Sequence, residues 1–156
     1  MTPSAFDALQ PAAGASSPLE RFLRAFDRLD ADACAAMFAA DGRLRFADGG
    51  AEEGITAVRE RLRDYFADLR ATEHVLGERW HFERVWIGEV EATYTLADDS
   101  RSGPVSKVFV MRMRDGAIQD LRVYAAGEPS FHEAVIRHER DRIRGLLVGG
   151  RWMPPL

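Results

Sequence analysis

The chain has 156 residues, of which 46% are hydrophobic and 29% charged, a balance typical of one globular domain with its own core. The formal net charge of −4 argues against a nucleic-acid-binding protein, because phosphate recognition needs a clustered positive field. The single cysteine, Cys34, can form no intrachain disulfide, and no apolar run approaches the roughly 18 residues of a membrane span. No signal peptide is evident. We therefore expect a cytoplasmic protein that binds neither nucleic acid nor membranes.

The first predicted element is a helix. Residues 1–17 are rich in Ala, Pro and Ser without periodicity and are interpreted as a flexible tail. From Pro18 the apolar residues recur at helical spacing. This stripe comprises Leu19, Phe22, Leu23, Phe26 and Leu29.

Three further elements are expected before residue 70. Asp30 or Asp32 can cap a second, shorter helix, which Asp41-Gly42 would end. Residues 43–47 alternate in polarity, which predicts a short strand. After an acidic, glycine-rich loop at residues 48–54, a third helix is expected. Its apolar side comprises Ile55, Val58, Leu62, Tyr65 and Leu69.

Strands dominate the second half of the chain. Alternation predicts strands over residues 72–84 and 89–96, joined near Gly88 and followed by a polar turn at residues 98–104. One face of the first strand would carry His74, Leu76, Glu78, Trp80 and Phe82. One face of the second would carry Val90, Ala92, Tyr94 and Leu96.

The strongest local signal is a β-hairpin. Two largely apolar runs, residues 105–113 and 117–124, flank Asp115-Gly116, a dipeptide strongly preferred in two-residue hairpin turns. A final amphipathic helix is expected over residues 133–147, with glycines beyond its end. Helices first and antiparallel strands afterwards indicate an α+β fold with the helices on one face of a curved sheet.

Three helices, a short strand and a long antiparallel meander ending in an Asp-Gly hairpin resemble the nuclear transport factor 2-like superfamily. Within it, the chain is most similar to SnoaL-like proteins and ketosteroid isomerases, over about residues 19–129. The resemblance implies a cone-shaped curved antiparallel sheet with the three N-terminal helices packed on its concave face. The expected organisation is a tail at residues 1–17, the domain at residues 18–128 and a C-terminal helical extension at residues 129–156.

The same resemblance places the three catalytic positions of an isomerase on phenylalanines. The oxyanion-binding tyrosine falls on Phe22, the general-base aspartate on Phe46, and the neutral aspartic acid that donates a second hydrogen bond on Phe109. Phenylalanine can neither take a proton nor donate a hydrogen bond to an oxyanion, so ketosteroid isomerisation is excluded. SnoaL-like cyclases commonly carry an acid just after the final strand. Here that stretch is Ala-Ala-Gly at residues 125–127, followed by Glu128.

Lys107 shares a strand parity with Phe109 and could therefore project into an apolar pocket. Desolvation there would lower its pKa and favour the neutral, nucleophilic amine. The alternative is a lysine at the wet end of its strand, three residues after Pro104, with its stem snorkelling.

His74 could form a proton-transfer pair with Tyr94 or Asp48, because imidazole titrates near neutral pH and needs a partner to hold its tautomer. It could equally be a structural hydrogen-bonding group. The candidate catalytic residues are thus His74, Lys107 and Tyr94. The expected pocket lining, which could instead be plain core, is Phe22, Phe46, Leu62, Tyr65, Trp80, Ala92, Phe109, Met111 and Val123.

Two functions follow from these predictions. The first is a protein that binds an apolar or aromatic small molecule in the cone, and that could be an isomerase- or cyclase-type enzyme acting on a hydrophobic carbonyl compound. The second is a non-catalytic dimerisation or accessory module with a filled pocket.

A homodimer through the convex sheet face is implied by the resemblance. That face would carry Arg112, Asp120, Arg122 and Tyr124, although a solvated sheet would look the same. No cofactor is expected. No metal site is expected either, because Cys34 stands alone and His132 and His138 are spaced to lie on different helix faces.

Overall fold

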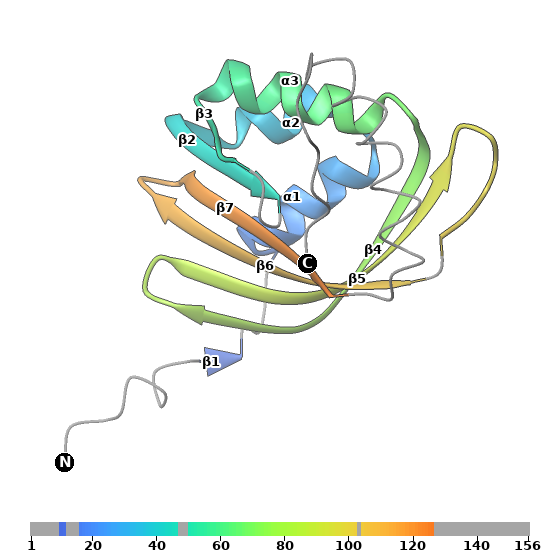
Figure 1. The fold of residues 1–156 in the computed structure, drawn as a ribbon. Coiled ribbons are helices and arrows are strands. Elements are labelled where there is room, and N and C mark those ends of the chain that lie inside the picture. Colours follow the sequence, from blue (N-terminus) through green and yellow to red (C-terminus); the bar gives the residue numbers. More distant parts are fainter. Residues whose placement is uncertain (1–9, 12–15, 47–49, 103, 127–156) are drawn as a thin grey trace.

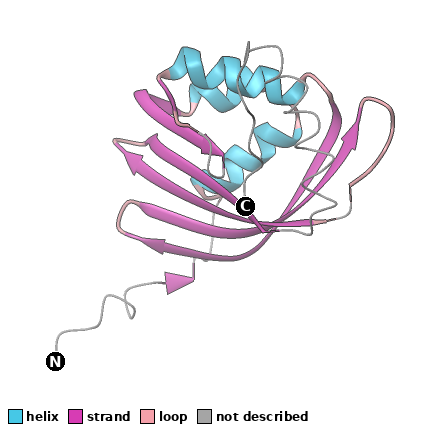
Figure 2. Ribbon diagram, in the orientation of Figure 1, coloured by secondary structure: helices cyan, strands magenta, loops and turns pink. Residues whose placement is uncertain are grey.

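The computed structural model describes residues 10–11, 16–46, 50–102 and 104–126. Within these ranges the helices gather on the concave face of a strongly curved, unclosed sheet (Figures 1 and 2). The expected α+β cone is therefore confirmed. The helix predicted for residues 133–147 lies outside the described residues.

Capping signals determine where the helices begin. The side-chain oxygen of Ser17 accepts a hydrogen bond from the Glu20 backbone N–H at 3.1 Å, just before a first turn that contains proline. Asp30, one of the two predicted caps, accepts a hydrogen bond from the Ala33 N–H at 2.9 Å. The helices of the described residues are α1 (Pro18–Asp27), α2 (Ala31–Ala36) and α3 (Ile55–Phe66). None of them is long and apolar enough to span a membrane.

The strands form one sheet in the order β1-β4-β5-β6-β7-β2-β3. All neighbours are antiparallel except β2 and β7, which run parallel. Their bounds are β1 (Gln10–Pro11), β2 (Phe38–Phe46), β3 (Glu52–Glu53), β4 (Leu69–Phe82), β5 (Val85–Leu96), β6 (Val105–Arg114) and β7 (Ala117–Ala126).

The hairpin between β6 and β7 is confirmed. Arg114 pairs with Ala117, leaving a two-residue turn. Asp115 and Gly116 have φ angles of 51° and 78°, and positive φ at both positions defines the turn whose twist matches that of the flanking strands.

The second helix is shorter than predicted, because its last expected turn belongs to the sheet. α2 ends at Ala36, and Phe38 already pairs with Ile118 of β7. The Ile118 backbone N–H donates to the Met37 carbonyl oxygen at 2.8 Å. Strand pairing between distant segments here overrides the local helical pattern.

The predicted junction at Gly88 is also wrong. β4 and β5 turn at residues 83–84, and Gly88 lies inside β5. A Cβ at Gly88 would lie 2.5 Å from Leu19 Cδ2 and 2.9 Å from Leu76 Cδ1. The glycine therefore allows α1 to approach the sheet closely, a use of glycine that local sequence cannot distinguish from a turn.

A bulge in β4 corrects the predicted parity of that strand. The register shifts between Leu76, which pairs with Val90, and Arg79, which pairs with Gly88. Arg79 forms an ion pair with Glu20 of α1 and so faces the helices. The neighbouring Trp80 consequently faces the other side of the sheet, and its predicted place in the pocket lining is wrong.

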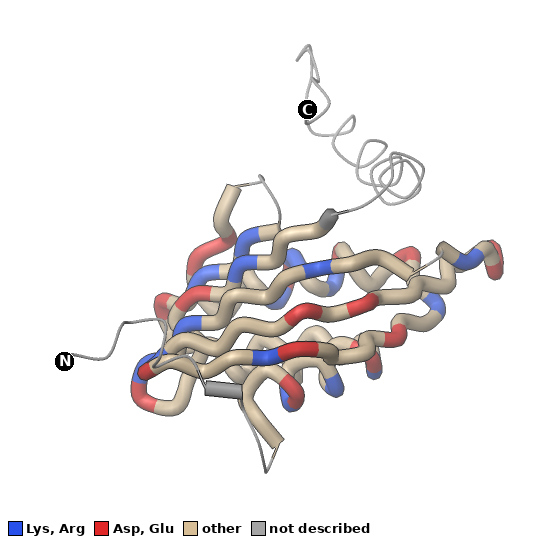
Figure 3. The backbone as a smooth tube through the Cα atoms, turned by 90° about the horizontal axis from the view of Figure 1, so that it is seen from below, with Lys and Arg blue, Asp and Glu red and all other residues tan. Residues whose placement is uncertain are grey.

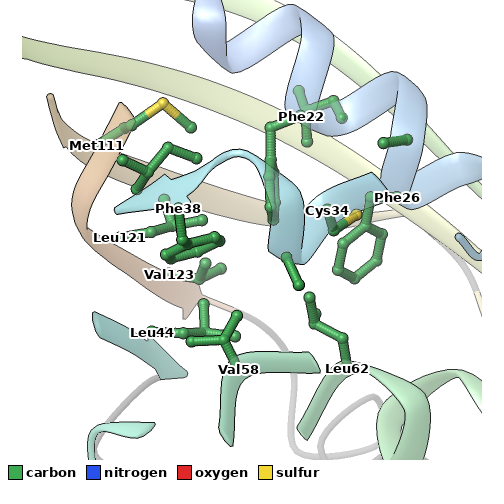
Figure 4. Packing of buried hydrophobic residues seen from close by; sticks show 14 of the residues in the cluster. Phe22, Phe26, Cys34, Phe38, Leu44, Val58, Leu62, Met111, Leu121 and Val123 are labelled. Atoms are coloured by element: carbon green, nitrogen blue, oxygen red, sulfur yellow. The ribbon is translucent and has the colours of Figure 1, made fainter. Parts of the chain in front are cut away.

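One apolar cluster fills the space between the helices and the sheet (Figure 4). It joins α1 to the strands through Phe22, which packs near Phe38 with ring centroids 6.1 Å apart. Phe22 and Phe109, two of the isomerase-equivalent positions, are each 1% exposed and belong to it. Other buried members from the sheet and α3 include Leu44, Val58, Leu62, Met111, Leu121 and Val123.

The convex face of the sheet carries the four predicted residues. In β6 and β7 they alternate with the buried side chains, so the expected parity is confirmed. Acidic residues lie along β4 and β5 of this face, namely Glu73, Glu89 and Glu91. Basic residues lie along β2 and β7, namely Arg43, Arg45 and Arg122 (Figure 3). Exposed Val108 lies on β6, between the two groups, and pairs with exposed Tyr124 of β7.

Candidate active site

A small set of polar side chains interrupts the apolar interior next to α1. Asp27 comes from the last position of α1, His74 from β4, Tyr94 from β5 and Lys107 from β6. The side chain of His74 is 0% exposed and Lys107 is 7% exposed, whereas the side chain of Asp27 is 29% exposed. The group therefore runs from the rim of the helix layer into the interior.

Asp27 holds His74 through its carboxylate. Asp27 Oδ1 lies 2.6 Å from His74 Nδ1, and Oδ2 accepts a hydrogen bond from the His74 backbone N–H at 3.1 Å. The Thr72 hydroxyl donates to Oδ1 at 3.0 Å. An ionised carboxylate only accepts hydrogen bonds, so Nδ1 of the neutral ring carries the proton and Nε2 carries a lone pair.

Nε2 of His74 is buried and has no hydrogen-bond partner among the described residues. Burial lowers the pKa of His74, and the charge of Lys107 lowers it further. The hydrogen bond that His74 donates to Asp27 raises this pKa but does not outweigh burial. The ring is therefore neutral at pH 7. Its unpartnered nitrogen is a hydrogen-bond acceptor, and a base, aimed into the interior.

Lys107 and Tyr94 form the second polar pair. Lys107 Nζ donates a hydrogen bond to the Tyr94 hydroxyl and lies 4.6 Å from the centroid of the Tyr94 ring. Burial lowers the pKa of Lys107 to about 7. Burial also raises the pKa of Tyr94 well above its usual value, as does a hydrogen bond with Tyr65. Tyr94 therefore remains protonated while Lys107 titrates near neutrality.

Aromatic rings separate and orient these polar groups. The His74 ring meets those of Tyr94 and Phe109 edge-on, at centroid distances of 6.0 and 6.2 Å. It packs against Phe26 at 5.0 Å. Phe46 and Tyr65 are half-buried and stack at 5.2 Å with 8° between their planes. The site is thus a small polar group enclosed by flat apolar surfaces.

The structure brings all three predicted catalytic residues together. The alternative that Lys107 lies at the solvated end of its strand is contradicted by its burial, because only 7% of the residue is exposed. Tyr94 touches His74 only through ring contacts; the hydrogen-bond partner of the imidazole is Asp27. Asp48, the other predicted partner, lies outside the described residues.

Asp27 was missed by the sequence analysis, although a signal was present. It lies four residues after Leu23 and eight after Leu19, so it continues the buried stripe of α1. An acid at a core-facing helical position needs a partner inside the fold, which predicts a contact with another element.

The predicted lining residues are mostly well packed. Half-buried Phe46 and Tyr65 pack against the core, while six lining residues are fully buried: Phe22, Leu62, Ala92, Phe109, Met111 and Val123. Burial raises the pKa of the Cys34 thiol to about 12, which makes it unreactive. Among the described residues, no cluster of His, Cys, Asp or Glu side chains could hold a metal ion.

The chain belongs to the SnoaL-like domain family, whose model matches residues 19–121. Curated proteins of similar sequence were not found.

Solved structures share the fold at low sequence identity. A protein of ketosteroid isomerase-like fold from Catenulispora acidiphila, solved with trimethylamine, is 15% identical, with a TM-score of 0.68 over 78% of this chain and 92% of its own. An LEH-like epoxide hydrolase from Mycobacterium tuberculosis is 16% identical, with a TM-score of 0.63 over 82% of this chain and 93% of its own. A putative SnoaL-like polyketide cyclase from Jannaschia is 16% identical, with a TM-score of 0.60 over 74% and 91%. These similarities define the fold of the chain.

Proposed function

We propose that this SnoaL-like domain binds an apolar or aromatic carbonyl compound in its cone and transfers a proton within it, as an isomerase- or cyclase-type enzyme. The observation that carries the proposal is Nε2 of His74, which is buried, unprotonated and without a partner among the described residues. An unsatisfied buried nitrogen costs about 1 to 3 kcal/mol, and a ligand or water that donates to it would recover this energy.

The proposed reaction is removal of a proton next to the ligand carbonyl. His74 Nε2 takes the proton, and Asp27 stabilises the resulting imidazolium through the Nδ1–H hydrogen bond. The developing negative charge on the carbonyl oxygen is met by the Lys107–Tyr94 pair. The aromatic rings around His74 suit a flat, apolar ligand. Similarity to a putative polyketide cyclase supports a carbonyl compound as the ligand class.

A thermal-shift series tests ligand binding. We expect hydrophobic aromatic ketones and aldehydes to raise the melting temperature, because a ligand that binds only the folded state stabilises it. His74→Gln, which keeps the size of the ring but removes the base, should retain this shift. It should, however, slow exchange of the ligand's α-protons with deuterated water by about 10²- to 10⁴-fold. The proposal fails if no carbonyl compound changes the melting temperature, or if His74→Gln exchanges protons at the wild-type rate.

Homodimerisation through the convex face is a second proposal, and it is compatible with either a catalytic or an accessory role. Its supporting observation is the uneven charge of this face: β4 and β5 carry glutamates, whereas β2 and β7 carry arginines (Figure 3). Asp120 of β7 is an acidic exception and forms an ion pair with Arg122. A two-fold axis along the strand direction would set the acidic half of one copy against the basic half of the other. The exposed side chains of Val108 and Tyr124 would then lie near the axis.

Charge reversal tests this arrangement. Glu89→Lys with Glu91→Lys should shift the protein towards monomer in native mass spectrometry, and adding Arg43→Glu and Arg45→Glu should restore the dimer. Glu60→Lys, on the exposed face of α3, is the matched control and should change nothing. A wild-type protein that is monomeric at high micromolar concentration would contradict the proposal.

A further inference from the structure

Lys107 is the only lysine among the 21 basic residues of the chain, and it is buried. Every other basic position is arginine. The two residues differ in a way that matters in a core: a guanidinium keeps its proton, whereas an ammonium readily loses it when water is removed. The one basic side chain that can become a neutral amine is therefore the one that the fold encloses.

The surroundings of Nζ favour the neutral amine. No carboxylate pairs with it in the described part of the chain; its hydrogen-bond partner is the Tyr94 hydroxyl. Phe109 and Val105 flank it on the inner face of β6, and both are buried. Burial alone lowers the pKa of Lys107 to about 7, so the neutral amine is populated at neutral pH.

A proton acceptor lies close to the amine. Lys107 and His74 both contact the Tyr94 ring: Nζ lies 4.6 Å from its centroid, and the imidazole centroid lies 6.0 Å from it. His74 Nε2 is unpartnered among the described residues. The site therefore combines an amine nucleophile, Lys107, with a base, His74. Covalent catalysis by an amine requires this pair of groups.

We propose that Lys107 Nζ attacks the carbonyl carbon of the ligand and binds aldehydes and ketones covalently as an imine. This deepens the proposed function, on which it rests, because the ligand class and the base are the same. The nitrogen lone pair forms the new C–N bond while the carbonyl π electrons move to oxygen. His74 Nε2 carries one proton from nitrogen to that oxygen, which gives the carbinolamine, and then carries the second proton from nitrogen to the hydroxyl. The C–O bond breaks, one water molecule leaves, and the neutral imine remains.

The imine would serve the proton transfer. Once protonated, it withdraws electrons from the neighbouring carbon more strongly than the parent carbonyl does. His74 can then remove the α-proton to give an enamine, and reprotonation at another carbon moves the double bond. Hydrolysis by water releases the product and restores the amine, with no oxidant or reductant consumed.

Reductive trapping tests the imine directly. The native protein is incubated with benzaldehyde and sodium cyanoborohydride at pH 7 and analysed by intact mass and peptide mapping, in which Lys107 offers the only side-chain amine. We expect one benzyl group on Lys107, formed at least tenfold faster than in the same protein unfolded in urea. The reason is that an ordinary lysine of pKa about 10.4 has about 10³-fold less free amine at pH 7. The rate at which Lys107 of the native protein is benzylated should level off above about pH 7.

Variants separate this inference from the proposed function. Lys107→Met should not be trapped, yet benzaldehyde and benzyl alcohol should still raise its melting temperature. His74→Gln should be trapped more slowly while remaining folded by circular dichroism. If benzaldehyde stabilises the native protein but Lys107 reacts no faster than in urea, the imine is refuted and the proposed binding site stands. If benzaldehyde neither stabilises the protein nor is trapped on Lys107, both the imine and the proposed function are refuted.

Discussion

Replacing Lys107 with methionine should change how the stability of the protein depends on pH. The folded state holds this amine at a pKa of about 7, and in the unfolded chain the usual value is about 10.4. Between these values the unfolded state binds a proton that the folded state does not. The free energy of unfolding of the wild type should therefore rise with pH, by up to about 1.4 kcal/mol per unit.

The measurement is urea unfolding, followed by circular dichroism, at intervals from pH 7 to pH 9.5. Over this window the lysine alone should raise the free energy of unfolding of the wild type by roughly 3 kcal/mol. Lys107→Met keeps the length of the side chain without its charge, so the difference in stability between variant and wild type should be largest at pH 7 and shrink as the pH rises. Arg84→Met removes an exposed charge instead, and its free energy of unfolding should change with pH as that of the wild type does. Parallel curves for Lys107→Met would refute a buried, neutralised lysine.

Two further substitutions probe the geometry around α1. Asp27→Asn weakens three hydrogen bonds, which should cost about 1 to 3 kcal/mol, and an amide donor facing Nδ1 should move the proton of His74 to Nε2. Long-range ¹⁵N imidazole spectra distinguish the two tautomers, and an unchanged tautomer would contradict the role of Asp27. Gly88→Ala should cost about 1 to 3 kcal/mol because its Cβ would meet Leu19. Gly77→Ala, where the nearest atom lies at 3.5 Å, is the matched control, and equal costs would contradict the close approach of α1.

Signals that act over a few residues were predictable from the sequence. Asp115-Gly116 determines its hairpin because the required positive φ angles are a property of those two residues. The Asp30 cap was predictable because its partner is the backbone N–H three residues later. The alternation of β6 was predictable because it depends only on an unbroken strand, with Val105, Lys107, Phe109 and Met111 all buried on one face.

Signals that depend on distant segments were misread. The bulge in β4 reverses the faces of all later residues in that strand, including Trp80, and nothing local distinguishes it from a regular strand. Phe38 lies in a strand rather than a helix because Ile118 is available to pair with it. Gly88 was interpreted as a turn because its actual reason, contact with Leu19, comes from a helix 69 residues earlier in the chain.

The sequence by itself therefore determined the order of the main helices and strands and the SnoaL-like cone. It also placed phenylalanine at the three positions that the resemblance equates with isomerase catalytic groups, Phe22, Phe46 and Phe109. It also identified His74, Tyr94 and Lys107 as candidate catalytic residues. Only the tertiary structure decided that Lys107 is buried and that Asp27 holds His74, since these two partners are 47 residues apart. The physical reason is that burial and hydrogen bonding depend on which distant segments of the chain come into contact. Here the packing of α1 against the curved sheet determines those contacts.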